Sequence, residues 1–302
     1  MSLGPLDKLS RFFESSGLSR YQLREVIASG RMSTIHRAYD SKTYKSVAVK
    51  VLNEAGLKMR KVLRAKQPEL DQIIVSIEHP NVVRTFEFIQ RGQKHYQVME
   101  YVQGTNIGRM KGRSFAELFS LLVEAARGLQ YLHDRYNLIH RDINPNNIVV
   151  NSENIPKIID MDFAFVAVND SKGILRRSGT LGYMAPEQVK GRQLTKSMDI
   201  YSWGATAYEI LTGANPYRDH TGSSEEMRQE NTRRNHLRLI PQPPSKVNPE
   251  INGKVDAVIM RCLEIETSAR YPSIGDLVAE LERVCGSFLP SSRKSSARRS
   301  RA

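Results

Sequence analysis

Residues 138–162 read LIHRDINPNNIVVNSENIPKIIDMD, and the rest of the chain can be interpreted around this stretch. It places a carboxylate at Asp142, an amide five residues later at Asn147, and a second carboxylate thirteen residues further on at Asp160. Phosphoryl transfer needs side chains of these kinds, because one must orient an attacking hydroxyl and others must hold Mg²⁺ against the phosphates. The apolar residues 148–150 predict a short buried strand that presents these polar groups at its end.

The composition is that of an ordinary globular protein, with 302 residues of which 40% are hydrophobic and 25% are charged. This length allows one large domain or two lobes. The chain has no secretory signal and no apolar run near the roughly 18–20 residues that cross a bilayer, so we expect no transmembrane segment and a cytoplasmic location. The two cysteines, Cys262 and Cys285, lack metal-ligand spacing and predict buried thiols in a reducing compartment.

The net charge of +13 is concentrated in two basic runs. Five of these charges lie in residues 286–302, which contain no acid, and a second run spans residues 58–66. Such runs would attract an acidic partner, nucleic acid or an anionic membrane surface. The simpler interpretation is a solvated, disordered tail and a solvated helix face. The chain has no clear nucleic-acid-binding motif with interleaved aromatic residues.

A strand–turn–strand pattern runs through residues 21–39, with Ala28, Gly30 and Ser33 as its small residues. Such a turn can close over a nucleotide with backbone N–H groups facing phosphate, although alone it indicates only a β-hairpin. An apolar strand with a single lysine, Lys50, follows twenty residues after Gly30. A lone lysine in a strand usually extends its ammonium group to solvent. Hydrophobic periodicity predicts further strands at residues 82–88 and 95–101, and helices at residues 68–77, 115–136, 255–263 and 274–284.

Several motifs resemble, in order and spacing, those of eukaryotic-type (Hanks-type) serine/threonine protein kinases. The matching segments are residues 47–51 for the strand V-A-I-K, residues 140–147 for the catalytic loop H-R-D-x-x-x-x-N, residues 179–187 for the end of the activation segment, and residues 198–204 for the helix D-x-W-S-x-G. The ending A-P-E-Q at residues 185–188 resembles the bacterial branch. The resemblance covers residues 21–286.

This resemblance implies an α+β fold of two lobes, with a β-rich N-lobe that has one main helix and a larger helical C-lobe. ATP would bind between the lobes. We therefore expect an N-terminal lead-in at residues 1–20, the N-lobe at residues 21–101, the C-lobe at residues 102–287 and a basic, disordered tail at residues 288–302.

The resemblance also implies catalytic roles for Asp142, Lys50 and Asn147. Asp142 would orient the hydroxyl of a protein substrate and accept its proton, and Lys50 would position the ATP phosphates. Asn147 and Asp160 would hold Mg²⁺ or Mn²⁺, and Asp162 could become a third metal ligand.

By the same residue match, a set of side chains and backbone groups would contact ATP: Ile27, Gly30, Ile35, Ala48, Lys50, Glu69, Met99, Glu100, Val102 and Val149. Glu69 is the expected partner of Lys50. Counting back from residues 79–81 instead places Leu70 in the position of the family's glutamate, so this pairing requires an inserted residue or a shifted helix.

The chain departs from the family pattern at four places. Asn144 stands where a lysine contacts the γ-phosphate, so we expect a lower kcat. Met161 and Asp162 replace the phenylalanine and glycine of D-F-G. Asp162 could restrict the backbone turn that the glycine allows. Asn146 replaces a glutamate that recognises a substrate arginine in some relatives, so no basic-substrate preference is predicted. The glycine-rich turn keeps only Gly30.

Residues 160–187 resemble the activation segment and contain available hydroxyls at Ser171, Ser178 and Thr180. Phosphorylation there would add charge that Arg141 could pair with, and we expect the chain to phosphorylate itself at such a site.

Two alternatives remain open. A pseudokinase would keep the fold as a nucleotide-binding scaffold, but all four groups of the core chemistry are present. A small-molecule phosphotransferase also lacks the lysine of the catalytic loop, and its metal motif resembles residues 159–162. Against it stand residues 179–187 and 198–204, and Arg270, which resembles the family's buried arginine that pairs with Glu187.

Overall fold

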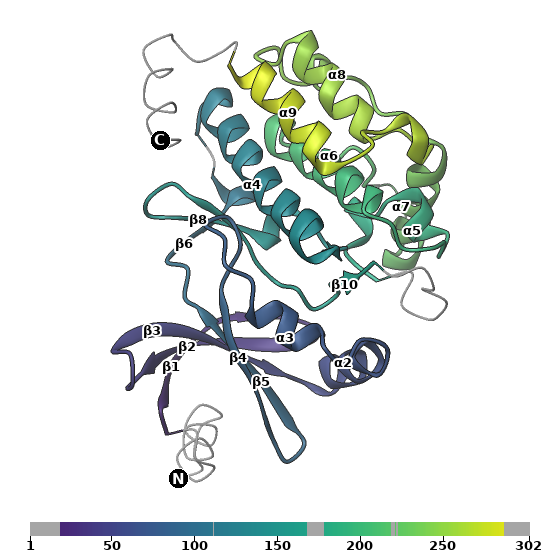
Figure 1. The fold of residues 1–302 in the computed structure, drawn as a ribbon. Coiled ribbons are helices and arrows are strands. Elements are labelled where there is room, and N and C mark those ends of the chain that lie inside the picture. Colours follow the sequence, from purple (N-terminus) through teal and green to yellow (C-terminus); the bar gives the residue numbers. More distant parts are fainter. Residues whose placement is uncertain (1–18, 111, 168–177, 219–220, 222, 287–302) are drawn as a thin grey trace. The chain divides into compact units, whose positions relative to one another are not determined.

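The computed structural model describes residues 19–110, 112–167, 178–218, 221 and 223–286. The chain divides into two compact units, Met1–Gly104 (unit 1) and Thr105–Ala302 (unit 2) (Figure 1). Unit 1 is built on a β-sheet and unit 2 is mainly helical, which confirms the predicted α+β class. Residues 1–18 of the predicted lead-in and the whole predicted tail lie outside the described residues.

Unit 1 contains a five-stranded antiparallel sheet with the strand order β1-β2-β3-β5-β4. Its strands are β1 (Tyr21–Ser29), β2 (Ser33–Asp40), β3 (Lys45–Leu52), β4 (Thr85–Arg91) and β5 (Lys94–Glu100). The Gly30 N–H donates to the Ser33 carbonyl at 2.9 Å and closes the turn between β1 and β2. The predicted strand–turn–strand pattern is therefore a β-hairpin.

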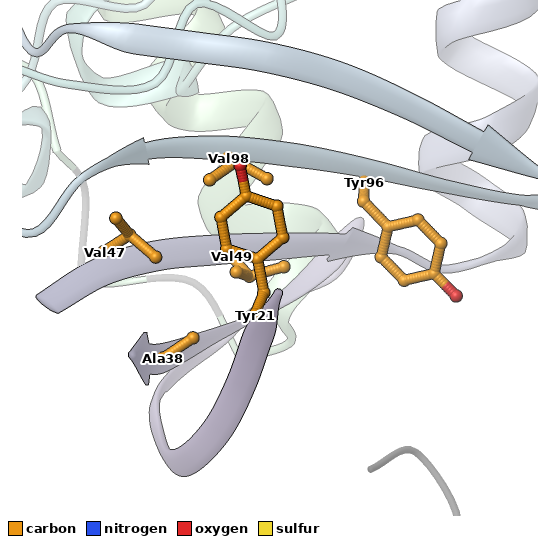
Figure 2. Close-up of a cluster of buried hydrophobic side chains, with 6 residues drawn as sticks. All are labelled: Tyr21, Ala38, Val47, Val49, Tyr96 and Val98. Atoms are coloured by element: carbon orange, nitrogen blue, oxygen red, sulfur yellow. The ribbon is translucent and has the colours of Figure 1, made fainter. Parts of the chain in front are cut away.

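One face of this sheet carries a buried apolar cluster. Figure 2 shows its six side chains, which come from β1, β2, β3 and β5: Tyr21, Ala38, Val47, Val49, Tyr96 and Val98. Successive side chains of a strand point to opposite faces, so Ala48 and Lys50 project from the other face of β3. The strand register pairs Ile35 with Lys50 and Met99 with Ala48. Four of the residues predicted to contact ATP therefore share one face of the sheet.

Two helices lie between β3 and β4: α2 (Glu54–Lys66) and α3 (Leu70–Val75). The sequence predicted one helix over residues 68–77, and the observed α3 is shorter. Pro68 disfavours helical geometry at the preceding residue, and Gln67 leaves the helix with φ −139° and ψ 76°. Asp71 of α3 forms ion pairs with Arg60 and Arg64 of α2, which join the two helices.

The α-helices described in unit 2 are α4 (Phe115–Tyr136), α5 (Pro186–Val189), α6 (Ser197–Thr212), α7 (Glu225–Arg238), α8 (Gly253–Cys262) and α9 (Ile274–Cys285). Short strands and 3₁₀ turns connect them: β6 (Gly104–Asn106), η1 (Ile107–Arg109), β7 (Leu138–Ile139), η2 (Pro145–Asn147), β8 (Ile148–Asn151), β9 (Pro156–Ile158), β10 (Phe165–Val166), η4 (Leu181–Tyr183), η5 (Pro244–Lys246) and η6 (Thr267–Ala269). β7 pairs with β10 and β8 pairs with β9, both antiparallel.

Local sequence explains both ends of α4. Ser114 and Glu117 form a capping box at its start, and Asn137 ends it in the left-handed conformation with φ 52°. The chain then enters β7 directly.

Helix α6 lies deep in unit 2, with most of its side chains buried. Its Trp203 is fully buried and donates from Nε1 to the Leu122 carbonyl of α4 at 3.1 Å. A Cβ on Gly204 would lie 2.6 Å from the Cβ of Cys262, so glycine is needed where α6 meets α8. Cys262 is buried, as predicted, and Cys285 is half-buried. None of the helices in the described part of the chain has the length and apolar character to cross a bilayer.

Candidate active site

The loop of residues 140–147 connects β7 to β8 and holds the Asp142 carboxylate in a fixed orientation. Asn147 donates from Nδ2 to Asp142 Oδ2 at 3.0 Å and to the Asp142 carbonyl at 2.8 Å. The Thr180 backbone N–H donates to Asp142 Oδ1 at 2.7 Å. Two of the residues predicted to be catalytic, Asp142 and Asn147, are thus in direct contact, and a segment distant in sequence supplies a second donor.

Burial raises the pKa of Asp142 above the ordinary value of an aspartic acid, because the charged form is poorly solvated. Hydrogen bonds from Thr180 oppose this shift by stabilising the ionised form, and the nearby Asp160 carboxylate adds to it by repulsion. The result is a carboxylate that takes up a proton more readily than one in water.

Asp199 of α6 supports the 140–147 loop from within the core. It accepts hydrogen bonds from the backbone N–H groups of His140 and Arg141 and from His133 Nε2, all at 2.8 Å. Burial disfavours the ionised form, but the hydrogen bond from His133 and the other donors outweigh it, and the pKa of Asp199 is lowered. The sequence assigned this helix by resemblance but gave Asp199 no role. The available indication was an acidic residue in the first turn of a helix that is largely buried.

Arg141 adopts a left-handed conformation, with φ 71°, that non-glycine residues rarely adopt. This geometry is held by the backbone N–H groups of His140 and Arg141, which both donate to Asp199. The Nη1 of Arg141 donates to the Phe163 carbonyl at 3.2 Å. Arg141 was expected to pair with a phosphate on Ser171, Ser178 or Thr180. Ser171 lies outside the described residues, and for Ser178 and Thr180 the pairing stays a prediction.

Gln188, at the start of α5, connects the 140–147 loop to the segment before η4. Its buried Nε2 donates to the Arg141 carbonyl at 3.1 Å and also to the Ser178 carbonyl. Gly179, which follows Ser178, has φ 131°. A Cβ at this residue would lie only 2.7 Å from the Arg141 carbonyl oxygen. From the sequence, Gln188 was noted only for the A-P-E-Q resemblance and was assigned no structural role.

Asn144, which replaces the family's lysine, is buried and has an organising role. Its Nδ2 donates to the Asp142 carbonyl at 3.0 Å and to Thr180 Oγ1 at 3.4 Å, and its Oδ1 accepts the Asn146 N–H at 3.0 Å. The Asn144 amide therefore connects the 140–147 loop to Thr180, just before η4. Unlike the lysine that it replaces, it carries no positive charge.

Asn147, Asp160 and Asp162 carry the oxygen atoms that were predicted to bind a metal. Asp160 has φ 66°, and its Oδ1 accepts the Asp162 N–H at 3.1 Å. The Ile159 N–H donates to the Asn147 carbonyl at 2.9 Å, which brings the end of β9 to the 140–147 loop. The positive φ falls at Asp160 and not at Asp162, so the residue that replaces the D-F-G glycine needs no left-handed backbone.

This donor set suits a hard cation such as Mg²⁺ or Mn²⁺, since carboxylate and amide oxygens are the ligands these ions prefer. Across the described residues, no three His, Cys, Asp or Glu side chains form a metal-binding group. Mg²⁺ commonly takes one or two carboxylates and completes its shell with water and phosphate, so the residues present fit such an ion.

In unit 1, Lys50 is 2% exposed on the sheet face opposite the apolar cluster. Its cross-strand neighbour is Gln97, whose Nε2 donates to Thr85 Oγ1 at 2.9 Å. The remaining predicted ATP contacts differ in exposure. Ala48 and Met99 are buried on unit 1 and Val149 on unit 2, Ile35, Glu100 and Val102 are half-buried, and Ile27 and Gly30 are exposed.

The expected ion pair between Glu69 and Lys50 does not form in the described structure. Glu69 is exposed and precedes α3, whereas Leu70, the first residue of that helix, is fully buried. The helix therefore turns Leu70 inward, at the position that counting back from residues 79–81 gives to the family's glutamate. The pairing of Glu69 with Lys50 stays a prediction that the described residues do not support.

Arg270 forms the buried ion pair with Glu187 that the resemblance implied. Its Nη1 and Nη2 each lie 2.8 Å from one carboxylate oxygen of Glu187. The guanidinium also donates to the Glu264 carbonyl at 2.8 Å and stacks over the Tyr201 ring at 4.9 Å. This pair joins the start of α5 to the segment between α8 and α9.

Comparison with known proteins gives an independent line of evidence. A family profile described as "Protein kinase domain" matches residues 21–280. The chain is 29% identical over 279 residues to "Serine/threonine-protein kinase PknB" of Mycolicibacterium smegmatis, covering 88% of this chain and 43% of that protein. It is 30% identical over 275 residues to "Probable serine/threonine-protein kinase SCO3848" of Streptomyces coelicolor, covering 87% and 39%. The chain thus spans less than half the length of these relatives.

Proposed function

The chain belongs to the protein kinase domain family, and from this premise we propose that it transfers the γ-phosphoryl group of ATP to serine or threonine hydroxyls of a protein substrate. The observation that carries the proposal is the hydrogen-bonded unit of Asp142, Asn147 and Thr180. Such a unit presents one carboxylate in a fixed orientation, which is what an acceptor hydroxyl needs. The names of the similar bacterial proteins support the choice of serine and threonine as acceptors.

In the proposed reaction, the acceptor oxygen forms a bond to the γ-phosphorus as the bond from that phosphorus to the β–γ bridging oxygen breaks. Asp142 orients the hydroxyl and takes its proton. Lys50 positions the phosphates, and Asn147, Asp160 and Asp162 supply oxygen ligands for Mg²⁺ or Mn²⁺. The bound cation would neutralise negative charge on the phosphates. Because the reaction consumes ATP, we also infer a cytoplasmic location.

Asn144 and Leu70 favour a slow enzyme. A neutral amide replaces a lysine near the predicted phosphate position, and a buried leucine, the first residue of α3, stands where the family has a carboxylate. By the resemblance, the lysine would stabilise the transition state and the carboxylate would fix Lys50, so both changes would remove useful charge. The same two residues favour the second candidate function, a nucleotide-binding scaffold that transfers no phosphate.

The first experiment is a transfer assay with labelled ATP, Mg²⁺ or Mn²⁺, and a generic acceptor protein. We expect label on the acceptor and on the chain itself, at Ser171, Ser178 or Thr180 by phosphopeptide mapping. The Asp142→Asn variant should lose transfer by about 10²–10⁴-fold, because a general base contributes this much. The exposed Ser41→Ala change on unit 1 serves as a matched control.

Retained ATP binding without label in the presence of either metal would contradict the proposed transfer and support the scaffold. Label that persists in the Asp142→Asn variant would contradict the role of Asp142 and point to a contaminating kinase. Label on a small-molecule acceptor but on no protein would favour the phosphotransferase alternative.

A further inference from the structure

Arg218 lies beside the segment that orients the Asp142 carboxylate. Thr180 donates its N–H to Asp142, and Gly182 follows two residues later within η4. A Cβ added at Gly182 would lie 3.7 Å from Arg218 Nη2, which is ordinary contact distance. The guanidinium therefore sits against the turn that begins immediately after Thr180.

One side chain fastens Arg218 in this place. Asn215 donates from Nδ2 to the Gly182 carbonyl at 3.0 Å, and its Oδ1 accepts the backbone N–H groups of Tyr217 and Arg218, each at 3.0 Å. The position of Arg218 relative to η4 is thus set by hydrogen bonds to the backbone on both sides. Only its exposed guanidinium end has freedom to reach a ligand.

The acidic side chains of residues 178–218 are already engaged elsewhere. They are Glu187, Asp199 and Glu209. Glu187 is buried with Arg270, Asp199 holds the 140–147 loop, and Glu209 accepts hydrogen bonds from Tyr183 and Asn215 at 2.7 and 2.9 Å. Arg218 forms no ion pair within the described part of the chain. Its exposed guanidinium is therefore in direct contact with none of these acids, and Glu209 is near enough only to act with it on the Tyr183 hydroxyl.

On the other side of the 140–147 loop, the described residues nearest to it carry an amide and a guanidinium. Asn146 is exposed, and its carbonyl accepts a hydrogen bond from Asn106 Nδ2 at 2.7 Å. Gly108 packs so closely on Pro145 that a Cβ there would lie 2.8 Å from the proline Cβ. This contact brings Arg109, the last residue of η1, next to η2. The two flanks of the Asp142 loop thus carry arginine and asparagine side chains.

We propose that Arg218 recognises a negatively charged residue close to the acceptor hydroxyl, so that this kinase selects acidic or already phosphorylated segments. The inference rests on the proposed function and names its substrate class. A guanidinium suits this task because its fork of N–H donors matches the two oxygens of a carboxylate or phosphate. Carboxylate and phosphate share this chemistry, and the experiment separates them.

The test uses a neutral serine peptide and matched peptides that carry one aspartate or one phosphoserine, placed at each of three positions on either side of the serine. We expect at least one anionic position to raise kcat/KM by about fivefold to twentyfold, mainly through KM, as charge-assisted hydrogen bonds do. Arg218→Gln should remove this preference and leave kcat on the neutral peptide unchanged. Arg135→Gln, an exposed arginine at the end of α4, is the matched control and should keep the preference.

An equal preference for aspartate and phosphoserine would identify any anion as the ligand, and a preference for phosphoserine alone would identify primed substrates. Equal kcat/KM for neutral and anionic peptides, or an anionic preference that survives Arg218→Gln, would overturn the inference. Peptide binding to the Asp142→Asn variant, followed by fluorescence anisotropy, separates the two proposals. Preferential binding of anionic peptides without any transfer by the wild type would uphold this inference and refute the proposed function.

Discussion

Among single residues, Asp142 owes its chemistry to neighbours from distant parts of unit 2. Asn147 and Thr180 direct its two oxygens, while Asp199 fixes the backbone of the preceding residues. Burial raises its pKa, and the Thr180 hydrogen bonds limit that rise. The proton affinity of this carboxylate is therefore a property of the assembled site.

This balance predicts a pH dependence. The proposed reaction needs ionised Asp142, so activity should be lost as the pH falls through its raised pKa, at a higher pH than for an ordinary aspartic acid. Thr180→Val removes a hydrogen bond that stabilises the charged form, so the acid limb of kcat should move to still higher pH. The measurement is kcat against pH at constant ionic strength, with the exposed Ser41→Ala as control. An acid limb that stays in place in Thr180→Val would contradict this account.

At the scale of elements, the start of α5 depends on a buried charge pair. Glu187 and Arg270 are almost fully buried, and their bidentate contact joins segments 83 residues apart in the sequence. Removing one partner leaves the other charge buried without compensation, which is much more costly than losing an exposed pair.

Arg270→Leu should therefore lower the free energy of unfolding by about 3–5 kcal/mol. Arg283→Leu, which breaks an exposed pair with Glu280 on α9, is the matched control and should cost at most about 1 kcal/mol. Urea denaturation followed by circular dichroism measures both. A cost for Arg270→Leu no larger than that of the control would show that the pair does not stabilise unit 2. The double variant Glu187→Leu/Arg270→Leu should recover part of the loss.

The helices of unit 1 give the basic run a structural role. Arg60 and Arg64 pair with Asp71 of α3 and lie over the Phe88 ring, at 4.7 and 5.9 Å from its centroid. These charges hold α2 to α3 and β4, which accounts for part of the run without an external ligand. An acidic partner for the basic tail remains a proposal, since residues 287–302 lie outside the described part of the chain.

For the molecule as a whole, ATP binding is predicted to draw on both units. Lys50 belongs to unit 1, and the predicted metal ligands Asn147 and Asp160 belong to unit 2. A ligand that binds only the folded protein stabilises it by about 2.7 kcal/mol at one hundred times its Kd.

ATP with Mg²⁺ at that concentration should therefore raise the melting temperature by about 5–10 °C. Lys50→Met and Asp160→Asn should each reduce the shift, and the Asp160 change should also remove its dependence on Mg²⁺. Differential scanning fluorimetry measures the effect, with Arg135→Gln as the control that keeps it. A full shift in both variants would mean that nucleotide binds elsewhere.

Sequence alone determined the features that depend on local order. Short apolar runs and the turn of small residues predicted the strands of unit 1, helical spacing predicted α4, and the five-residue separation of Asp142 and Asn147 placed them in one loop. Motif order also indicated the family and the Glu187–Arg270 pair, because each motif carries its own residue pattern.

Only the tertiary structure decided which distant side chains meet. The Arg141 N–H donates to Asp199, which is 58 residues away in the sequence. The Arg141 carbonyl accepts a hydrogen bond from Gln188 of α5. In the folded chain Leu70 is buried and Glu69 is exposed. The helix propensities of these residues cannot distinguish two positions that differ by one residue. The physical reason is that such contacts depend on how helices and loops pack in space, whereas the periodicity of a segment records only which of its own faces is buried.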